Sequence, residues 1–302
     1  MPTFDINQIP SQKGRVAIVT GANAGLGYET ALVFAQKDLT VIMACRNLEK
    51  GAKARDKILQ QVPGADLDLM QLDLSAMQSV REFAEHFLKK YNRLDLLVNN
   101  AGVMVPPYTE TEDGFELQFA TNYLGHFLLT GLLLDTVLQT PQSRVVSLSS
   151  IAHKNGKIRF EDLQSRKKYS AMGAYSQSKL ACLLFAYEMQ RRLEKKGSST
   201  LSVAAHPGVS NTDLPRHYPK WTKIIEPLIV PIFTHSPKQA AEPTLYAALG
   251  QDVNGGDYFG PDGWNEMKGQ ATKVNSTPLS KDPEVARRLW EVSEELTGVR
   301  YL

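Results

Sequence analysis

Tyr175 and Lys179, four positions apart, form a pair suited to acid–base chemistry. On a helix, residues i and i+4 share one face, so the phenol and the ammonium would point into the same space. A cation beside a phenol favours the phenolate and brings its proton transfer toward a working pH. Because a Tyr/Lys pair at this spacing is also common on helix surfaces, its interpretation depends on the rest of the chain.

A glycine-rich segment, residues 20–27, reads Thr-Gly-Ala-Asn-Ala-Gly-Leu-Gly between an apolar run and a helical pattern. Glycines permit a tight turn, close backbone approach to a pyrophosphate and close packing of helix on strand. The helix N-terminus adds free N–H groups and a positive dipole end for phosphates. The spacing is G-x-x-x-G-x-G and not the commoner G-x-G-x-x-G. Its position predicts a dinucleotide site at Gly21, Asn23, Ala24, Gly25, Leu26 and Gly27.

The residue after the second expected strand distinguishes NAD from NADP. NAD sites usually carry an acidic residue there for the ribose hydroxyls, whereas an arginine suits a 2′-phosphate. This chain reads Ala44-Cys45-Arg46-Asn47, without an acid. The planar guanidinium of Arg46 can bind a phosphate through two parallel hydrogen bonds. The sequence therefore predicts NADP(H), with a simple surface arginine as the alternative.

The elements that must position these residues alternate along the chain. Largely apolar runs predict strands covered on both faces, at 15–20, 40–44, 67–72, 94–99, 143–148 and 200–205. Amphipathic segments of helix length lie between them, near 25–37, 47–61, 76–91, 111–138 and 174–196. Such alternation is typical of βαβ units with right-handed crossovers. We predict an α/β fold of Rossmann type, a doubly wound parallel sheet with helices on both faces.

The last third of the chain departs from this alternation. A Pro- and Gly-rich excursion runs over about 208–237, a last strand lies near 257–259, and Asp282-Pro283 starts a C-terminal helix at about 283–296. Because no low-complexity linker separates two cores, we predict a single domain over 1–302. The helix near 174–196 could pair with a copy of itself, and the oligomeric state stays open.

Composition excludes several classes of protein. The 302 residues are 42% hydrophobic, enough for a large core, and the net charge of +2 gives no electrostatic reason for a nucleic-acid partner. Two cysteines and six histidines without ligand spacing predict neither a disulfide framework nor a metal site. No apolar run approaches the roughly 20 residues that span a bilayer. We expect a reduced, cytoplasmic setting.

Taken together, the motifs resemble those of the short-chain dehydrogenase/reductase family. In family order they are the loop at 21–27, Asn99-Asn100-Ala101-Gly102, Ser149-Ser150, Tyr175-x-x-x-Lys179 and His206-Pro207-Gly208. The resemblance covers roughly residues 12–260 and implies hydride transfer between a nicotinamide and a carbonyl carbon. Tyr175 would then be the acid/base and Ser150 would bind the substrate oxygen. Lys179 would hold the cofactor ribose and tune Tyr175, and Asn122 would hold the water that relays protons to Lys179.

The same resemblance implies further cofactor contacts. It places Asp73 and Leu74 near the adenine, Asn99 and Gly102 along the ribose, and Thr212 near the nicotinamide amide, with Ala101, Pro207 and Gly208 as additional contacts. Two alternatives stay open: Ser149 could be the functional serine, and Asp73 could simply cap the following helix. Histidines 126, 153 and 206 are interpreted as packing or loop residues.

Several stretches are closer to the retinol dehydrogenase branch of the family. They are Ala44-Cys45-Arg46, residues 122–130, and the segment 153–175, which lengthens the usual interval between Ser150 and Tyr175. Membrane-bound members carry an N-terminal apolar anchor, which this chain does not show. We therefore expect a soluble relative whose retinoid specificity is open.

The excursion normally covers the substrate in this family. Here it carries Trp221, Ile224, Ile225, Leu228, Ile229, Val230, Ile232 and Phe233. Such a lid favours a bulky hydrophobic alcohol or carbonyl. Alternatively these side chains pack on the sheet, or Lys220 and Lys223 help them to make a weak contact with a membrane surface.

Two other functions remain. Residues 113–117 and 121–127 also resemble the light-dependent protochlorophyllide reductase branch, although Asn100-Ala101-Gly102 differs from it. A non-catalytic NADP(H)-binding sensor or scaffold could use the same fold, because fold alone does not prove activity. An intact set of Asn122, Ser150, Tyr175 and Lys179 favours an enzyme.

Overall fold

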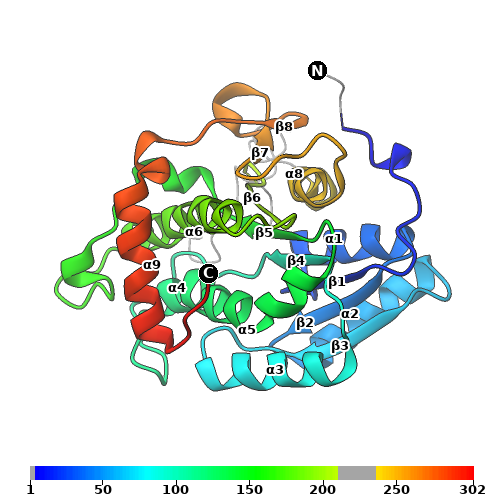
Figure 1. The fold of residues 1–302 in the computed structure, drawn as a ribbon, viewed down its shortest axis with the longest axis horizontal. Coiled ribbons are helices and arrows are strands. Elements are labelled where there is room, and N and C mark those ends of the chain that lie inside the picture. Colours follow the sequence, from blue (N-terminus) through cyan, green and yellow to red (C-terminus); the bar gives the residue numbers. More distant parts are fainter. Residues whose placement is uncertain (1–3, 210–235) are drawn as a thin grey trace, which may run out of the picture.

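The computed structural model describes residues 4–209 and 236–302, and strands and helices alternate through most of them (Figure 1). The strands are β1 (Val16–Thr20), β2 (Thr40–Cys45), β3 (Leu67–Gln71), β4 (Leu96–Asn99), β5 (Arg144–Leu148), β6 (Leu201–Ala205), β7 (Tyr258–Pro261) and β8 (Ala271–Lys273). The longer helices are α1 (Gly25–Gln36), α2 (Leu48–Gln61), α3 (Met77–Lys90), α5 (Gly125–Gln139), α6 (Ala171–Lys195), α8 (Pro237–Leu249) and α9 (Pro283–Thr297).

The strands form one sheet in the order β3-β2-β1-β4-β5-β6-β7-β8. All neighbouring pairs are parallel except β7 with β8, which are antiparallel. The strand order reverses between β1 and β4, and in open α/β sheets ligands bind at the carboxyl ends of the strands at such a switch point. The predicted doubly wound fold is confirmed, with an antiparallel edge strand that the sequence analysis did not predict.

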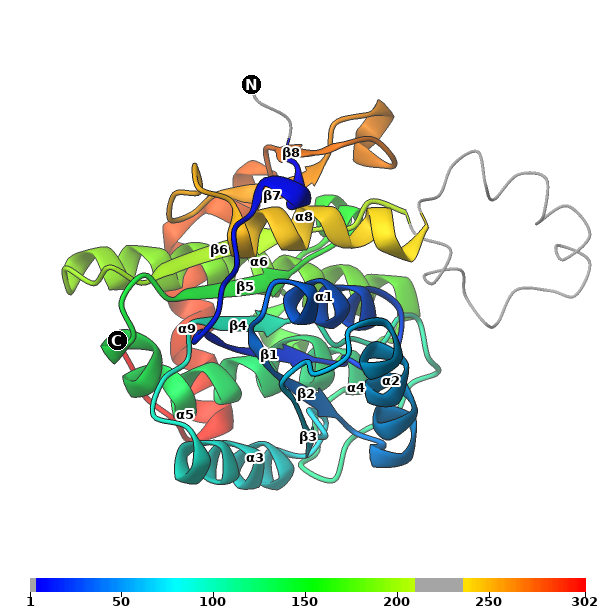
Figure 2. The same ribbon diagram turned by 90° about the vertical axis from the view of Figure 1, so that its right-hand side faces the viewer.

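Helices cover both faces of the sheet (Figure 2). Apolar residues of α1, α2 and α8 pack on one face, and those of α3, α5, α6 and α9 pack on the other. Strands β1 and β2 are almost wholly buried, as expected for strands covered on both sides. No helix in the described part of the chain is long and apolar enough to cross a membrane.

The helix predicted at 111–138 begins later, at α4 (Leu117–Phe119), and continues through a π-helical turn, η2 (Ala120–Leu124), into α5. A turn precedes it, because Gly114 has φ of 77° and its N–H donates to the carbonyl of Thr111. The Glu116 side chain then accepts from the N–H groups of Gln118 and Phe119 and caps the helix. Local capping, therefore, decides where this helix starts.

Two late elements were absent from the sequence prediction. Helix α8 starts in a capping box between Ser236 and Gln239 with Pro237 in its first turn, and it tolerates Pro243 in its interior. These prolines make the segment read as irregular, yet its buried alanines and Leu245 pack on the sheet. Strand β8 is too short for a visible pattern and exists through its pairing with β7.

The outer face of α6 is covered by α9 of the same chain. The rings of Phe185 and Trp290 stack with centroids 5.7 Å apart, and the guanidinium of Arg192 lies 4.4 Å from the Trp290 ring. Tyr301 closes this cluster by donating from its hydroxyl to the carbonyl of Phe127. This part of α6 therefore packs against α9 within the chain.

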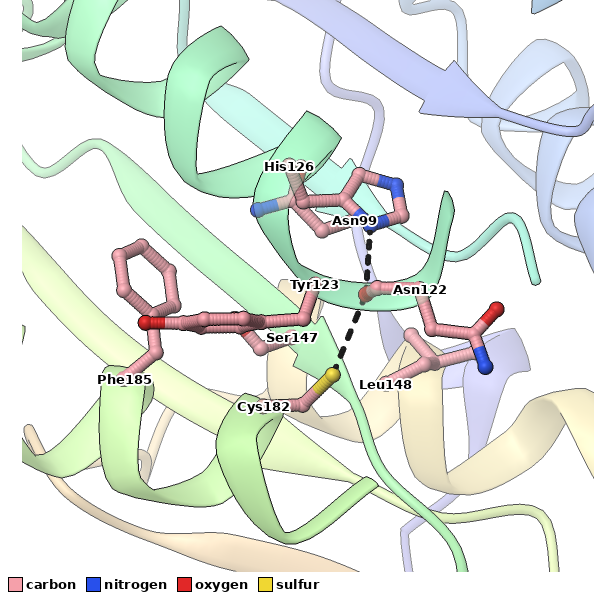
Figure 3. Close-up of a pocket in the computed structure, with 8 residues that line it drawn as sticks. All are labelled: Asn99, Asn122, Tyr123, His126, Ser147, Leu148, Cys182 and Phe185. Carbon is pink, nitrogen blue, oxygen red and sulfur yellow. Dashed lines mark hydrogen bonds between the residues drawn. The ribbon is translucent and has the colours of Figure 1, made fainter. Parts of the chain in front are cut away.

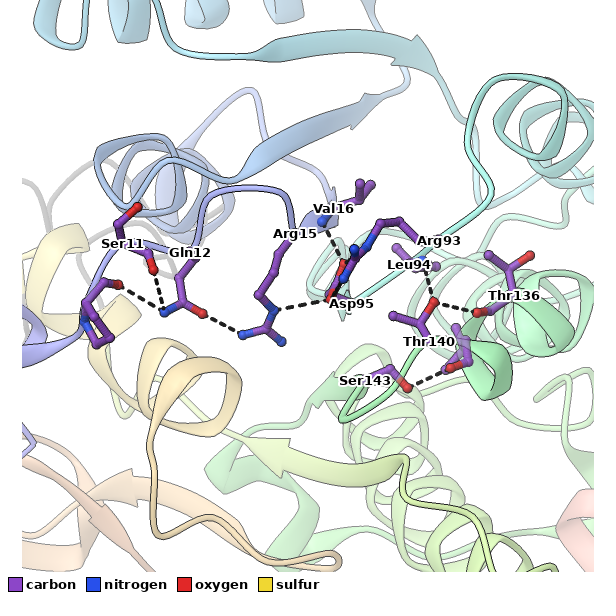
Figure 4. Close-up of polar contacts among 12 residues, drawn as sticks. Ser11, Gln12, Arg15, Val16, Arg93, Leu94, Asp95, Thr136, Thr140 and Ser143 are labelled. Carbon is purple, nitrogen blue, oxygen red and sulfur yellow. Dashed lines mark hydrogen bonds and ion pairs between the residues drawn. The ribbon is translucent and has the colours of Figure 1, made fainter.

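Asp95 ties β1 to the start of β4 at the amino-terminal edge of the sheet, away from the strand ends that form the switch point (Figure 4). Its carboxylate is 2% exposed and accepts from the N–H of Val16 and from Arg15 and Arg93. A buried carboxylate is tolerable only when such donors compensate for its lost hydration. These contacts stabilise the amino-terminal edge of the sheet.

Candidate active site

The glycine-rich loop joins β1 to α1. Gly21 and Gly25 have φ of 69° and 54°, in the left-handed region that glycine adopts without strain. Helix α1 begins at Gly25 after Ala24, which is exposed and makes no side-chain cap, while Asn23 is half-buried. The first N–H groups of α1 are therefore available to an anion.

Gly27 is required for the close packing of this loop. A Cβ at this position would collide with the carbonyl oxygen of Gly21 and with the side-chain nitrogen of Asn100. That nitrogen already donates to the carbonyl of Thr20, over 2.6 Å. The Asn100 side chain thus joins the segment after β4 to this loop, and Gly27 leaves the space that this side chain occupies.

Arg46 follows β2 directly and is exposed. Strand β2 pairs with β1 so that Ala44 lies opposite Thr20, and the N–H of Gly21 donates to the carbonyl of Ala44. Arg46 therefore stands beside the glycine loop, where the sequence predicted a 2′-phosphate contact.

The residues expected near the adenine follow β3. The carboxylate of Asp73 accepts from the N–H and the hydroxyl of Ser75, which makes a local turn before α3. Leu74 is buried, and its carbonyl oxygen lies against Gly125. The alternative that Asp73 caps the following helix is wrong: its carboxylate closes the turn at Ser75, and the N–H of Met77 at the start of α3 donates to Asp113 instead.

Residues of the loop after β4 face different parts of the molecule. The Asn99 side chain points away from the loop, is 4% exposed and donates to the hydroxyl of Thr130 on α5. It lines a small internal cavity together with Asn122, Tyr123, His126, Ser147, Leu148, Cys182 and Phe185 (Figure 3). Gly102, by contrast, lies against the catalytic candidates, because a Cβ on it would be 3.1 Å from Asn122 Oδ1 and 3.5 Å from Lys179 Nζ.

Helix α6 carries the two residues with which the sequence analysis began. Ser170 caps the helix by accepting from the N–H of Gly173, and Tyr175 and Lys179 follow on one face. Both are largely buried, and the ammonium of Lys179 lies 5.9 Å from the centroid of the Tyr175 ring. Lys179 Nζ also donates to the carbonyl of Leu148 at the end of β5.

The two serines after β5 have different surroundings. Ser149 is 3% exposed and its hydroxyl donates to the carbonyl of Lys179 over 2.8 Å, so it braces α6 against β5. Ser150 is half-buried and accepts from the N–H of Ala152 at the start of the 3-10 turn η3 (Ile151–Asn155). Ser150 is the serine whose hydroxyl hydrogen is available for a substrate oxygen.

Asn122 lies in the π-helical turn and bridges two neighbours. Its Oδ1 accepts from the N–H of Val103, while Nδ2 donates to the carbonyl of Val103 and to the hydroxyl of Ser178. Both of its side-chain hydrogens are used by protein groups, so the side chain positions α6 relative to the 102–103 loop.

The segment after β6 completes this edge of the sheet. Gly208 has φ of 73° and no room for a side chain, because a Cβ would collide with the carbonyl of Met267. His206 is fully buried and lies 3.0 Å from the carboxylate of Glu266, which also pairs with Lys154. Thr212 and most of the predicted lid lie outside the described residues.

The structure thus brings together the glycine loop, Arg46, Gly102, Asn122, Ser150, Tyr175, Lys179 and Gly208 at the carboxyl edge of the sheet. Sequence reasoning missed Thr20 and Asn100, which join the loops after β1 and β4. Their types are common at strand ends, so no local signal marks them. Among the described residues, no group of His, Cys, Asp and Glu is arranged to hold a metal ion.

The site combines a glycine-rich loop at the switch point of a parallel sheet with a helix that carries a Tyr/Lys pair. These features are typical of dinucleotide-binding α/β proteins with acid–base groups. The model of the short chain dehydrogenase family matches residues 15–223. The chain belongs to the short-chain dehydrogenase/reductase family, in its retinol dehydrogenase-like branch.

Individual relatives agree with this assignment. The chain is 44% identical over 293 residues to retinol dehydrogenase 13 of Mus musculus, covering 95% of this chain and 84% of that protein. It is 40% identical over 290 residues to retinol dehydrogenase 12 of Homo sapiens, covering 95% and 88%. An uncharacterized protein from Mycobacterium paratuberculosis has a similar crystal structure, with a TM-score of 0.84, 40% identity and complete coverage of both chains.

A more distant structure shows the same fold. The short chain dehydrogenase from Shigella flexneri complexed with NADP has a TM-score of 0.62 at 24% identity, covering 82% of this chain and 96% of that one. The family and the relatives show that the chain is an oxidoreductase of the short-chain type.

Proposed function

We propose that this chain interconverts a bulky hydrophobic alcohol and its aldehyde or ketone in an NADP(H)-dependent reaction. The observation that carries the proposal is the position of the Lys179 ammonium, which lies 5.9 Å from the centroid of the Tyr175 ring and beside Gly102, and which donates to the carbonyl of Leu148, two residues before Ser150. The nicotinamide cofactor, when bound, exchanges a hydride with the carbonyl carbon. All other parts of the reaction fall to side chains of this chain.

The residues present fit such a cofactor. Gly21 and Gly27 let the loop pack closely against Ala101 and Asn100, Gly102 lies beside Asn122 and Lys179, and the start of α1 offers uncapped N–H groups to a pyrophosphate. Arg46 offers two parallel donors to a 2′-phosphate, and no acid competes with it at the end of β2. The side chain of Asn99 is engaged with Thr130, so its contact with the ribose would come from the main chain.

Side chains on α6 and at the end of β5 carry out the acid–base chemistry. In the reductive direction Tyr175 donates its phenolic proton to the developing alkoxide, and in the oxidative direction it takes the proton back. The hydroxyl of Ser150 donates a hydrogen bond to the same oxygen and stabilises its charge. Lys179 favours the phenolate of Tyr175 by its positive charge. Asn122 keeps α6 at the correct distance from Gly102 through Ser178 and Val103.

The substrate class rests on the composition of the expected lid and on the names of the relatives. Residues 221–233 are strongly apolar, and retinol dehydrogenases are named for a long hydrophobic alcohol. A pocket closed by such residues would exclude water and favour bulky substrates over small ones.

Turnover of a carbonyl panel tests the proposal. We expect purified protein to oxidise NADPH with long-chain or retinoid aldehydes at a higher kcat/KM than with acetone-sized ketones, and to use NADH poorly. Tyr175→Phe should lose at least roughly a hundredfold in kcat, and Ser150→Ala more activity than Ser149→Ala. NADPH binding without turnover of any carbonyl would overturn the proposal and favour a sensor.

A further inference from the structure

His126 occupies a position between the cofactor-binding loops and the catalytic helix. It lies at the start of α5, is 4% exposed and uses both ring nitrogens. Its Nδ1 is 3.0 Å from the carbonyl oxygen of Asn122 (Figure 3). Its Nε2 is 2.9 Å from the hydroxyl of Thr20 at the end of β1. The sequence analysis interpreted this histidine as a packing or loop residue, and the structure adds two hydrogen bonds to its buried position.

The hydrogen-bond partners determine which nitrogen carries the proton. A carbonyl oxygen only accepts, so Nδ1–H donates to Asn122, and the unprotonated Nε2 must accept from the Thr20 hydroxyl. Burial lowers the pKa of His126 to about 4, and the nearby positive charge of Lys179 contributes to this lowering. The ring is therefore neutral at physiological pH.

The Thr20 hydroxyl extends this connection to the loop after β4. Its hydrogen faces His126 Nε2 at 2.9 Å and, at the longer distance of 3.3 Å, the carbonyl of Val98, while its oxygen accepts from the N–H groups of Asn100 and Ala101, each over 2.9 Å. At the other end, the Asn122 carbonyl also accepts from the thiol of Cys182 on α6. One continuous set of hydrogen bonds thus joins β1, the loop before Gly102, the π-helical turn and α6.

We propose that His126 is a positioning residue that holds the cofactor-binding loops and the Asn122 turn at the spacing required for hydride transfer. This inference rests on the proposed function. A phenylalanine keeps a flat ring at this buried position and makes neither hydrogen bond, but it is larger than the imidazole, so its effect on activity must be compared with its effect on stability. Because Lys179 lies against Gly102 and Asn122, a shift of the turn relative to the loop changes where its ammonium stands.

The tautomer can be measured without any assay of activity. We expect long-range ¹H–¹⁵N spectra of the ¹⁵N-histidine-labelled protein, assigned with His126→Phe, to show a neutral ring protonated at Nδ1 from pH 5.5 to pH 8. A ring protonated at Nε2, or an imidazolium in this range, would overturn the hydrogen-bond pattern on which the proposal depends.

Three substitutions of His126 distinguish the contributions of its two hydrogen bonds. In His126→Asn the amide nitrogen can replace Nδ1 toward Asn122, in His126→Gln the longer amide can replace Nε2 toward Thr20, and His126→Phe retains neither bond. We expect His126→Phe to lose roughly tenfold to a hundredfold in kcat/KM, and both amide variants to retain more activity than Phe. Activity of His126→Phe within about twofold of the unmodified protein would contradict the proposal.

Stability and cofactor binding serve as controls. Thermal unfolding of each variant shows whether a loss of activity only follows a loss of folded protein. If the three His126 variants lose the same melting temperature and do not differ in kcat, His126 has a structural role only. A double-mutant cycle with Thr20→Val should show non-additive losses in NADPH affinity, because both residues share one bond. Additive losses would overturn the proposed coupling.

The failure of the proposed function is distinguishable from the failure of this inference. If the unmodified protein binds NADPH but reduces no carbonyl, the proposed reaction is wrong. The tautomer and the NADPH affinities of the His126 variants still decide whether His126 positions the loops.

Discussion

Single hydrogen bonds distinguish residues that the sequence places side by side. Ser149 gives its hydroxyl hydrogen to the carbonyl of Lys179, whereas Ser150 accepts from a backbone N–H and keeps its hydrogen for another partner. Asn99 likewise turns its amide inward to Thr130, while Gly102, three positions on, lies against Lys179. In each pair the direction of one side chain decides which residue can meet a ligand.

Arg46 provides a test of cofactor choice at the same scale. A charge-assisted hydrogen bond contributes about 1.5–3 kcal/mol, so we expect Arg46→Ala to lower kcat/KM for NADPH by roughly tenfold or more, with little effect on NADH. Arg55→Ala serves as the control and should change neither, because Arg55 is a half-buried arginine on α2 that pairs with Asp56. Equal losses for both cofactors would exclude a 2′-phosphate contact at Arg46.

Among the elements, the contact between the β1–α1 loop and the loop after β4 is the tightest part of the site. Gly27 faces the carbonyl of Gly21 and the side-chain amide of Asn100, which bridges the two loops by donating to the carbonyl of Thr20. The π-helical turn η2 adds a third segment, and its Asn122 reaches both the 103 loop and α6. Three elements are therefore held by backbone contacts and by buried polar side chains.

Substituting Gly27 tests this arrangement. Gly27→Ala forces backbone atoms apart, so we expect a loss of about 1–3 kcal/mol in the free energy of unfolding and much weaker NADPH binding. Gly51→Ala is the matched control on α2, because its Cβ would press on the flexible end of the Leu69 side chain and otherwise make an ordinary contact with the Cβ of Cys45. Denaturant unfolding and NADPH titration measure both effects. A Gly27→Ala protein that binds NADPH normally would show that the close approach is not needed.

Over the whole molecule, the buried histidines connect stability with pH. Burial lowers the pKa of His126 and of His153 to about 4 and also lowers the pKa of His206. An unfolded histidine titrates near pH 6.5. Below that pH the unfolded chain binds protons that the folded chain rejects, so folding becomes less favourable.

We therefore expect the melting temperature to fall as the pH decreases from 6.5 toward 4. Each fully buried histidine contributes up to roughly 3 kcal/mol over this range. His153→Gln should make the dependence shallower, whereas His86→Gln, at an exposed position, should leave it unchanged. Thermal unfolding at a series of pH values measures this dependence, and a melting temperature constant from pH 7 to pH 4.5 would contradict the expectation.

Glu266 affects the stability of the fold at a lower pH than the histidines do. Burial by itself raises its pKa, but hydrogen bonds and charge from His206 and Lys154 outweigh burial and lower the pKa to about 2. Its stabilising contribution is complete above pH 4.5 and decreases as the pH falls toward 2.

The amino-acid sequence alone determined the fold class and the main parts of the site. Alternating apolar runs and amphipathic segments are local patterns, so the strands and most helices were predicted within a few residues of their observed ends. The glycine loop and the Tyr175–Lys179 spacing are equally local, because each acts within one turn or one helix. Those features could be read before any contact between distant segments was known.

Only the tertiary structure decided those features that depend on contacts between residues far apart in the sequence. The late start of the helix at Leu117, the existence of α8 and β8, the roles of the two serines and the direction of Asn99 all follow from specific contacts. His126 is the strongest case, since its partner Thr20 lies 106 residues away. Sequence periodicity reports which face of an element is buried, but a hydrogen bond depends on which atoms of other elements reach that face.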